Sequence, residues 1–598
     1  MIRLGTIIIS NSAKICLLTY TIFSYNTFHQ LHAFIPHPVD PLSSSDPVKS
    51  VSFTNFRLIP SGSGVHFIVL SGCPGERDAD FQELLSLGKI NEHAKLMNTD
   101  PYDAIIIGSG AGGLSAGTVL SRAGARIVVL EAMTDYGGYL NPFQRNGYRF
   151  DAGMHYLGQL GEGGVFRALL QRLGVWHSIE FNQIDPDGVI RFHCGDLEFH
   201  LPAGQQAIQT RLSDRFPGEA AAIKRFLASL LAIDRAVESA ADMNKGIGGF
   251  LHAVPSLPVL LSILRKNYAQ YVESFTPTKE LQAFLFMMNC GLPPQRAAAL
   301  VPILMFRHYL DGAYYPKGGS GALRDALVGM ITKNHGDLLN YTKVDGIRRD
   351  GELLTVTSGS RSWTSRSVIC NADPTHLYGT LLDPALISRK LRKRVSGIVP
   401  STGAFYAYVV TDLDLTEFGI GSGTIQHHDS LEAMRRQGMK CDANFGNFML
   451  SCTTLKDPDG GHAPPGKHII ELVSQMPFEP FARWSHLPAE RRGDSYRRLK
   501  ERLGRQLIRK AERYIPDLSN HISYVNYATP LTNHYWVNAP GGGCYGPAHI
   551  PSQVGPKRFG NKSHIPGLFL CGHGTLAGGV YPSIWSGEIA ASLALHYL

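Results

Sequence analysis

The sequence predicts an α/β protein built on a parallel sheet, and three observations carry this prediction. A short apolar run at 104–107 leads into the glycine pattern GxGxxG at 108–113 and then into a helical stretch. A second apolar run at 127–130 ends in Glu131. Near the C-terminus, from residue 567, a further strand is followed by a glycine turn and a helix. Strand, glycine turn, helix and strand in this order form a Rossmann-like unit, whose turn binds a dinucleotide.

The glycines of the first turn have separate roles in such a unit. Gly108 permits the tight turn, Gly110 lets the backbone approach the pyrophosphate, and Gly113 lets the helix pack closely on the strand. The amides at the start of the helix then face the phosphates, helped by the helix dipole. Glu131 stands 23 residues after Gly108, where its carboxylate can accept hydrogen bonds from the ribose hydroxyls.

Two features favour FAD over NAD as the dinucleotide. Gly137 and Gly138 form a second glycine pair soon after Glu131. This pair resembles the one that lies against the FAD diphosphate in glutathione-reductase-like flavoproteins. The C-terminal turn at Gly572 and His573 can place helix-start amides near the ribityl chain and the pyrimidine end of a flavin. A positive dipole end at that place would stabilise a reduced, anionic flavin.

We therefore expect a Rossmann-like FAD-binding domain of the glutathione-reductase type, built from separated pieces, with a mixed α+β substrate domain inserted between them. The first insert has mostly helical periodicity, and the second combines strand-like runs with a basic amphipathic helix. The expected cofactor pieces are 101–160, 311–375 and 541–598, and the expected substrate pieces are 161–310 and 376–540.

Residues 1–100 differ from the rest of the chain and predict a targeting leader and linker, partly disordered. The first acidic residue is Asp40, and Arg3, Lys14 and short apolar stretches precede it. A positive start, a short apolar stretch and few acids are typical of a targeting peptide. The run Leu-His-Ala-Phe-Ile-Pro at 31–36 resembles the cleavage context of two-part plastid presequences in algae with secondary plastids. A plastid location is expected; the alternatives are a signal peptide or anchor for the endoplasmic reticulum and a disordered leader.

Composition argues against several other classes of protein. The chain has 57 Lys and Arg against 49 Asp and Glu, a net charge of +8, without a basic block interleaved with aromatics, so no nucleic-acid partner is expected. The positive balance suits a solvated basic surface or contact with an anionic membrane. None of the nine cysteines forms a CxxC motif or a zinc-like Cys/His cluster, which predicts reduced thiols and no metal. No apolar run reaches the roughly 18 residues of a clear membrane span.

Several widely spaced motifs resemble one family over residues 103–598. They are Arg149–Leu157 (RFDAGMHYL), Tyr315–Ser320 (YPKGGS), Thr529–Thr532 (TPLT) and Gly542–Gly546 (GGCYG). Together they are similar to the carotenoid isomerase, phytoene desaturase and retinol saturase superfamily. The Phe-Asp-x-Gly-x-His-Tyr form is most similar to retinol saturases, since carotenoid isomerases typically lack this histidine. The resemblance implies FAD, a long isoprenoid polyene and peripheral attachment to a membrane.

The resemblance also bears on two cofactor contacts. Val344 matches the family strand whose backbone meets the adenine. The C-terminal turn departs from the family pattern, because Gly-Asp, whose acid contacts the ribityl hydroxyls, is replaced by Gly572-His573. An imidazole can also hydrogen-bond a hydroxyl, so FAD binding is still expected, but the electrostatics near the flavin differ.

No catalytic triad, carboxylate pair or metal set stands out, so the flavin is expected to carry the chemistry. His155 is the first candidate for proton transfer, since imidazole titrates near neutrality; the alternative is a buried structural histidine. Tyr156 and Tyr315 could donate to or wall a polyene, or be packing aromatics. Lys317 could lie near the flavin or a phosphate, or on a surface loop. The glycines at 318–319 imply a close backbone approach, plausibly to the cofactor.

The segment 247–268 combines apolar residues with Arg265 and Lys266, which suits docking on a bilayer, or an ordinary lid or core helix.

Three functions stay open from the sequence. The first is an FAD enzyme acting on C=C bonds of a carotenoid-like polyene by isomerisation, hydration, saturation or desaturation. The second is a retinol-saturase-like reductase in the endoplasmic reticulum. The third is a carotenoid-binding or scaffolding protein with an inactive flavin site.

Overall fold

The computed structural model describes residues 101–241, 253–288 and 291–598, and in the first 100 residues six strands. The chain divides into two units, Met1–Asp100 and Pro101–Leu598. The strands of the first unit pair as three antiparallel hairpins, β1 (Arg3–Asn11) with β2 (Lys14–Ile22), β3 (Leu31–Phe34) with β4 (Ser50–Phe53), and β5 (Phe56–Pro60) with β6 (His66–Leu70). Composition did not predict these strands, and a role of the unit as a targeting leader stays a prediction.

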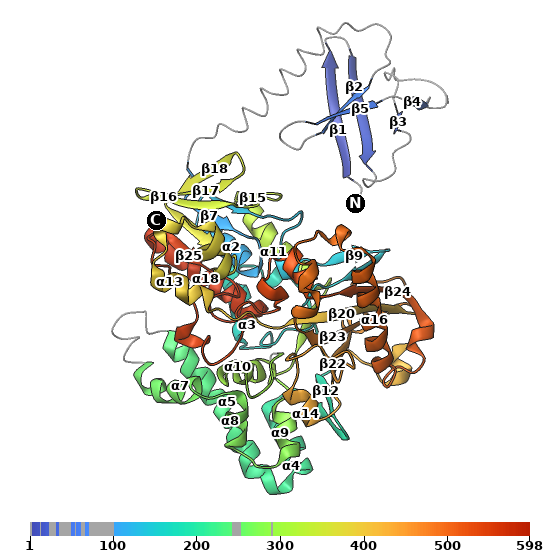
Figure 1. Ribbon diagram of the computed structural model, residues 1–598, viewed down its shortest axis with the longest axis vertical. Coiled ribbons are helices and arrows are strands. Elements are labelled where there is room, and N and C mark those ends of the chain that lie inside the picture. Colours follow the sequence, from blue (N-terminus) through green and yellow to red (C-terminus); the bar gives the residue numbers. More distant parts are fainter. Residues whose placement is uncertain are drawn as a thin grey trace. The chain divides into compact units, whose positions relative to one another are not determined.

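A five-stranded parallel sheet forms one centre of the second unit (Figure 1). Its strand order is β15 (Asp337–Leu339), β8 (Ile127–Leu130), β7 (Ala104–Ile107), β19 (Ser367–Cys370) and β25 (Leu568–Leu570). Every neighbouring pair in it is parallel. The sheet thus joins strands that lie more than 400 residues apart in the sequence, from all three ranges expected to hold the cofactor.

Both faces of this sheet are covered, which explains why its strands are continuous apolar runs. Alternate residues of β7, such as Ile106, pack toward the helices α2 (Ala111–Arg122), α11 (Ser320–Lys333) and α18 (Val580–Tyr597). The intervening residues, such as Ile105, pack toward a three-stranded antiparallel sheet. That sheet consists of β16 (Gly346–Asp350), β17 (Leu353–Ser358) and β18 (Arg361–Ser365).

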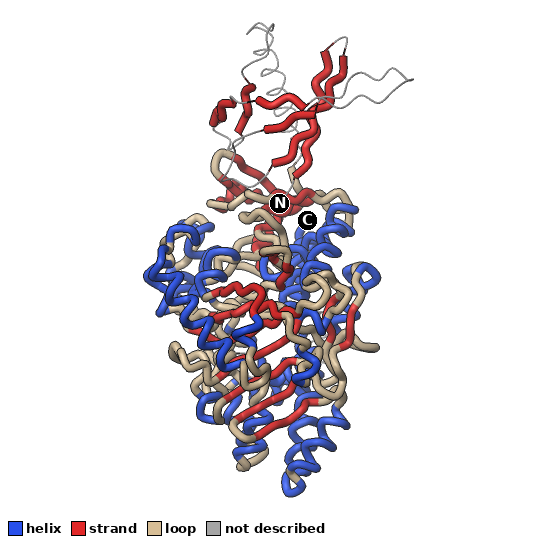
Figure 2. The backbone as a smooth tube through the Cα atoms, turned by 90° about the vertical axis from the view of Figure 1, so that its right-hand side faces the viewer, coloured by secondary structure: helices blue, strands red, loops and turns tan. Residues whose placement is uncertain are grey.

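A larger, seven-stranded mixed sheet forms the second centre (Figure 2). Its order is β13 (Leu197–Leu201), β12 (Ile190–Cys194), β21 (Thr424–His428), β22 (Asn447–Cys452), β23 (His468–Met476), β20 (Gly403–Thr411) and β24 (Ile522–Ala528). One face packs on α16 (Gly493–Ala511) through a core that includes Phe405 and Leu472. Tyr406 and Tyr408 of β20 lie in a different cluster, because side chains alternate along a strand.

Helices of the first insert gather at the end of this unit away from β16–β18, as the green ribbons of Figure 1 show. They are α4 (Gln205–Arg215), α5 (Ala220–Ala241), α7 (Leu257–Leu264), α8 (Tyr268–Glu273), α9 (Lys279–Leu285) and α10 (Leu300–Tyr309). The segment expected at 247–268 begins outside the described residues and continues as α7. Among the helices that the structure describes, none is both long and apolar enough to cross a membrane.

Candidate active site

A single cavity of about 1820 Å³ connects the end of the parallel sheet with one face of the larger sheet. This volume exceeds the roughly 300–1,000 Å³ of an ordinary small-molecule pocket, so it has room for a dinucleotide and a second molecule. Eight of the nine residues predicted to hold the cofactor line it: Gly108, Gly110, Glu131, Gly137, Gly138, Val344, Gly572 and His573. Gly113, the ninth, lies behind the turn.

The first glycine turn has the geometry that its sequence predicts, with one difference. Gly108 has a φ of +89°, a conformation that favours glycine. A Cβ on Gly113 would lie 1.9 Å from the carbonyl oxygen of Gly108, so only glycine lets α2 pack this closely. A Cβ on Gly110 would lie 2.7 Å from Nδ2 of Asn371. The side chain of Asn371, which directly follows β19, therefore also favours glycine here, which the motif alone does not reveal.

The start of α2 is suited to bind an anion. No side chain caps the helix at Gly110, and its first turn contains no acidic residue. Its first amides and the positive end of its dipole are therefore available to a phosphate. Gly112 is also required here, because a Cβ would lie 2.6 Å from the backbone nitrogen of Gly572. The C-terminal turn thus closes directly over the first one.

Glu131 is held in place at the end of β8. One carboxylate oxygen accepts hydrogen bonds from the backbone nitrogen of Ser109 at 2.8 Å and from its hydroxyl. The other accepts from the backbone nitrogen of Met133 at 2.9 Å. A carboxylate has about four acceptor positions and these bonds use three, so about one is left for a ribose hydroxyl. Val344 lines the same part of the cavity, as expected for an adenine contact.

The second glycine pair lies against the first turn. Gly137 and Gly138 have φ values of +115° and +56°. Gly137 forms a parallel bridge with Gly110, and its nitrogen donates to the carbonyl of Ser109 at 3.1 Å. The contact that the resemblance implied, with the diphosphate side of the site, fits this position.

His573, where the family pattern has an acid, has a carboxylate behind it. Its Nε2 lies 3.5 Å from Oδ2 of Asp373, which follows β19 in sequence. Burial raises the pKa of Asp373, but hydrogen bonds from His573 and Thr375 outweigh it, so this pKa lies below its usual value. Asp373 is therefore ionised and places a negative charge beside His573. A strand distant in sequence supplies the negative charge that the turn itself lacks.

His155 lines the cavity and is oriented by a buried glutamate. Its Nδ1 lies 3.0 Å from Oε2 of Glu471, whose side chain is 1% exposed. Burial raises the pKa of Glu471, but the hydrogen bond from His155 and the charge of Lys456 lower it by a larger amount. The pKa of Glu471 therefore lies below its usual value. An ionised Glu471 accepts from Nδ1–H of His155, so Nε2 is the nitrogen left to face the cavity. This nitrogen has no hydrogen-bond partner among the described residues.

Sequence reasoning missed Glu471, 316 residues from His155. One signal was present, since Glu471 is the only acid in the apolar strand β23. A lone charge in a buried strand requires a partner. Lys456 also belongs to this cluster, because it is buried and its Nζ donates to the carbonyl of His155 at 3.0 Å.

Of the other predicted residues, the structure places only Tyr156 in the cavity. Its ring packs edge-on against Tyr309 at 4.8 Å, and burial raises its pKa to about 12, so it remains a phenol. Tyr315 is fully buried and donates to Asp151 instead of lining the cavity. The backbone at 318–319 approaches the carboxylates of Asp151 and Asp457, not the cofactor site.

Lys317 is not brought to the cavity. Its side chain is 46% exposed, and its Nζ pairs with Glu180 at 2.7 Å on the surface. We expect a Lys317→Ala variant to keep its flavin and its turnover, with little change in stability, because exposed ion pairs are screened by solvent. Steady-state kinetics and flavin absorbance check this, and a large loss of turnover per flavin would restore Lys317 as a catalytic candidate.

Two buried histidines predict that the folded protein loses stability in acid. Burial lowers the pKa of His428 from 6.5 to about 4 and that of His549 to about 3. At acid pH the unfolded chain therefore binds protons at these histidines that the folded chain does not bind. The free energy of unfolding should rise as the pH increases from these lowered pKa values to 6.5. Urea unfolding at a series of pH values should show this slope. A His549→Gln variant should flatten it, while an unchanged slope would contradict the assignment.

The chain belongs to the family of flavin-containing amine oxidoreductases, whose model matches residues 111–595. It is a flavin enzyme with FAD as its cofactor, consistent with the fit of the glycine turns. It is 25% identical to the all-trans-retinol 13,14-reductase of Macaca fascicularis, covering 83% of this chain and 86% of the relative. It is 27% identical to the chloroplastic prolycopene isomerase 2 of an Oncidium hybrid cultivar, covering 92% and 93%.

Solved structures support the fold. Cyclohexylamine oxidase from Brevibacterium oxydans matches with a TM-score of 0.55 at 17% identity, covering 83% of this chain and 99% of that one. Putrescine oxidase bound to putrescine matches with a TM-score of 0.56 at 15% identity and the same coverage. At these identities the likeness bears on the fold alone: a mixed α/β architecture, consistent with the Rossmann-like prediction.

Proposed function

We propose that this enzyme acts on the C=C bonds of a long carotenoid-like polyene, by isomerisation or by addition such as hydration. The observation that carries the proposal is the single cavity that continues from the cofactor turns into an apolar chamber. Helix α10 lines this chamber with Leu300, Val301, Leu304 and Met305, and the facing sheet adds Met449 and Val473. A long apolar molecule is the ligand that such walls favour.

Bound FAD supplies electron-transfer chemistry to a conjugated substrate. The glycine turns and Glu131 hold the cofactor, and the apolar walls orient the polyene and exclude bulk water. His155 holds a proton at Nε2 beside the chamber, and Glu471 stabilises the charged imidazolium. A proton at this place can be added to a polyene carbon during saturation or hydration and returned during isomerisation.

A second candidate is a retinol-saturase-like reductase or desaturase of an isoprenoid in the endoplasmic reticulum. The histidine of Met154-His155-Tyr156 favours it, because this side chain lines the chamber as a proton donor for net reduction would. The similarity to the retinol reductases supports the same reading.

We also propose that the enzyme is attached peripherally to a membrane, in a plastid under the first function. The region around α7 supports attachment, since Val254, Val259 and Leu261 are 42%, 38% and 55% exposed. Exposed apolar residues followed by Arg265 and Lys266 suit a bilayer surface, from which an apolar substrate could enter. The chloroplastic relatives support a plastid, and the leader is consistent with it.

The test is turnover of a polyene panel by the purified FAD-loaded enzyme, with chemically reduced and with oxidised flavin. Mass spectrometry of the products separates the outcomes: an isomer keeps its mass, saturation adds two hydrogens, and hydration adds one water. An amine panel is the matched alternative, given the family. Conversion of amines with no change in any polyene would refute the proposal, and reduction of retinoids alone would select the second candidate.

A further inference from the structure

The polyene chamber is not apolar throughout, because one part of the sheet that walls it is polar. We define the His428 patch as His428, Asn447 and Gln475, all of which line the cavity. His428 lies on β21, Asn447 begins β22, and Gln475 lies on β23. A pure hydrocarbon cannot hydrogen-bond any donor or acceptor that these side chains leave free, and an unpaired buried polar atom costs free energy.

The patch is separated from the catalytic histidine along the strands. Glu471, the partner of His155, and Gln475 are four residues apart on β23, which corresponds to roughly 13 Å. Between them lies Val473, which pairs with Met449 on one side and Tyr406 on the other. An apolar row thus separates a reactive site from a polar patch, as suits a molecule with an apolar chain and a polar group beyond it.

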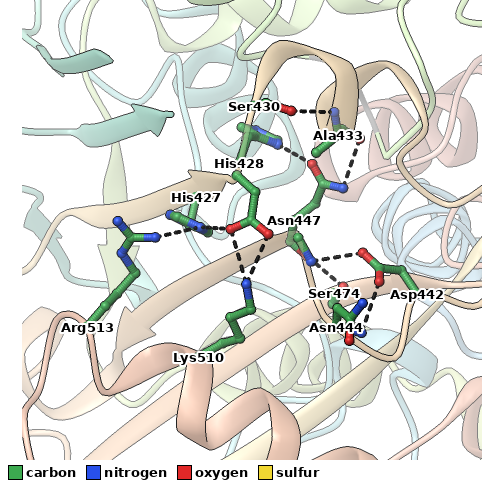
Figure 3. A network of polar contacts seen from close by, with 12 residues as sticks. His427, His428, Ser430, Ala433, Asp442, Asn444, Asn447, Ser474, Lys510 and Arg513 are labelled. Atoms are coloured by element: carbon green, nitrogen blue, oxygen red, sulfur yellow. Dashed lines mark hydrogen bonds and ion pairs between the residues drawn. The ribbon is translucent and has the colours of Figure 1, made fainter. Parts of the chain in front are cut away.

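The hydrogen-bond network determines what His428 offers to the cavity. The amide nitrogen Nδ2 of Asn447 donates to the carbonyl of Ala433 at 2.9 Å, which turns Oδ1 toward His428 (Figure 3). That oxygen can only accept, so Nδ1 of His428, 2.7 Å away, must carry a proton.

The imidazole is neutral in this position. His428 is 4% exposed, and its ring packs on Phe192 at 5.5 Å. Burial lowers the pKa of His428 to about 4. A neutral ring protonated at Nδ1 has a bare lone pair at Nε2. No described residue donates a hydrogen bond to this nitrogen, so the patch presents a fixed acceptor to the cavity.

We propose that the His428 patch binds a hydroxyl group carried by the polyene, with Nε2 of His428 accepting its hydrogen bond. The proposal rests on the proposed function and adds a substrate class to it, a hydroxylated polyene in place of a hydrocarbon. A hydroxyl matches the acceptor, whereas a ketone or an ether oxygen has no proton to donate.

The first test needs no variant. The FAD-loaded enzyme is titrated with β-carotene, its dihydroxy derivative and the dimethyl ether of that derivative, and binding is followed by quenching of tryptophan fluorescence, since Trp536 and Trp585 line the cavity. We expect the dihydroxy compound to bind about tenfold more tightly than the other two, the effect of one hydrogen bond. The ether controls for size and oxygen content.

The second test uses neighbouring histidines. A His428→Phe variant removes the acceptor, and we expect the tenfold preference to fall to about one. His427 is the matched control, because it lies on the opposite face of β21, where its ring contacts Tyr514 and Asp429. A His427→Phe variant should keep the preference for the hydroxyl.

The outcomes separate this inference from the proposed function. Equal binding of all three compounds by the wild-type enzyme would overturn the inference while leaving a polyene enzyme in place. A preference that survives in His428→Phe would also overturn it. If no polyene binds, the proposed function itself fails, and the inference fails with it.

Discussion

A Gly113→Ala variant is expected to lose its flavin and much of its stability. The added Cβ would lie 1.9 Å from the carbonyl oxygen of Gly108, a backbone atom that no rotamer change can move. Helix α2 must then withdraw from β7, and its first amides leave the phosphate site. Overpacking of this kind costs about 3 kcal/mol or more, and the same loss in binding would weaken FAD affinity about a hundredfold.

Flavin absorbance per protein and thermal unfolding measure this effect. Gly329→Ala is the matched control, because Gly329 lies in the neighbouring helix α11 and a Cβ there meets nothing within 4 Å. That variant should keep its flavin and be as stable as the wild type or slightly more so, since alanine favours a helix. Full flavin occupancy in Gly113→Ala would contradict the assigned role of this turn.

Removal of the His155 side chain is expected to have the largest effect on turnover. A His155→Ala variant should lose roughly 10²–10⁴-fold in kcat, the usual contribution of a general acid or base, while retaining FAD. Glu471 acts through His155 as a positioning residue. A Glu471→Gln variant should lower kcat, because the imidazolium loses its counter-charge. The double variant should be little worse than His155→Ala alone.

The control for this pair is a second buried histidine–carboxylate pair outside the cavity. His462 lies 2.9 Å from Asp457, and both side chains are almost fully buried. A His462→Ala variant should lower stability, as loss of any buried partner does, without lowering turnover per bound flavin. If His155→Ala and His462→Ala affect turnover equally, the role of His155 is structural.

Short-range patterns were sufficient to predict residues that the structure brings together in one cavity. Gly108, Gly110, Gly113 and Glu131 follow one another along a single strand–turn–helix–strand unit, so their positions depend mainly on local backbone geometry. His155 could be named as a candidate for the same reason, because it belongs to a continuous motif. The surface position of Lys317 could not be predicted, because the sequence of a loop determines neither the direction nor the exposure of a side chain.

By itself the sequence determined the class of cofactor and predicted the turns that would hold it, since these depend on residues adjacent in the chain. The tertiary structure decided which groups act together. Tertiary folding brings Glu471 of β23 to His155, Asp373 to His573 and, through strand pairing, Asn447 to His428, over separations of up to 316 residues. Such contacts depend on register and on which face of a strand a side chain occupies. Neither property is determined by a motif, because a register shift of one residue turns every side chain to the other face.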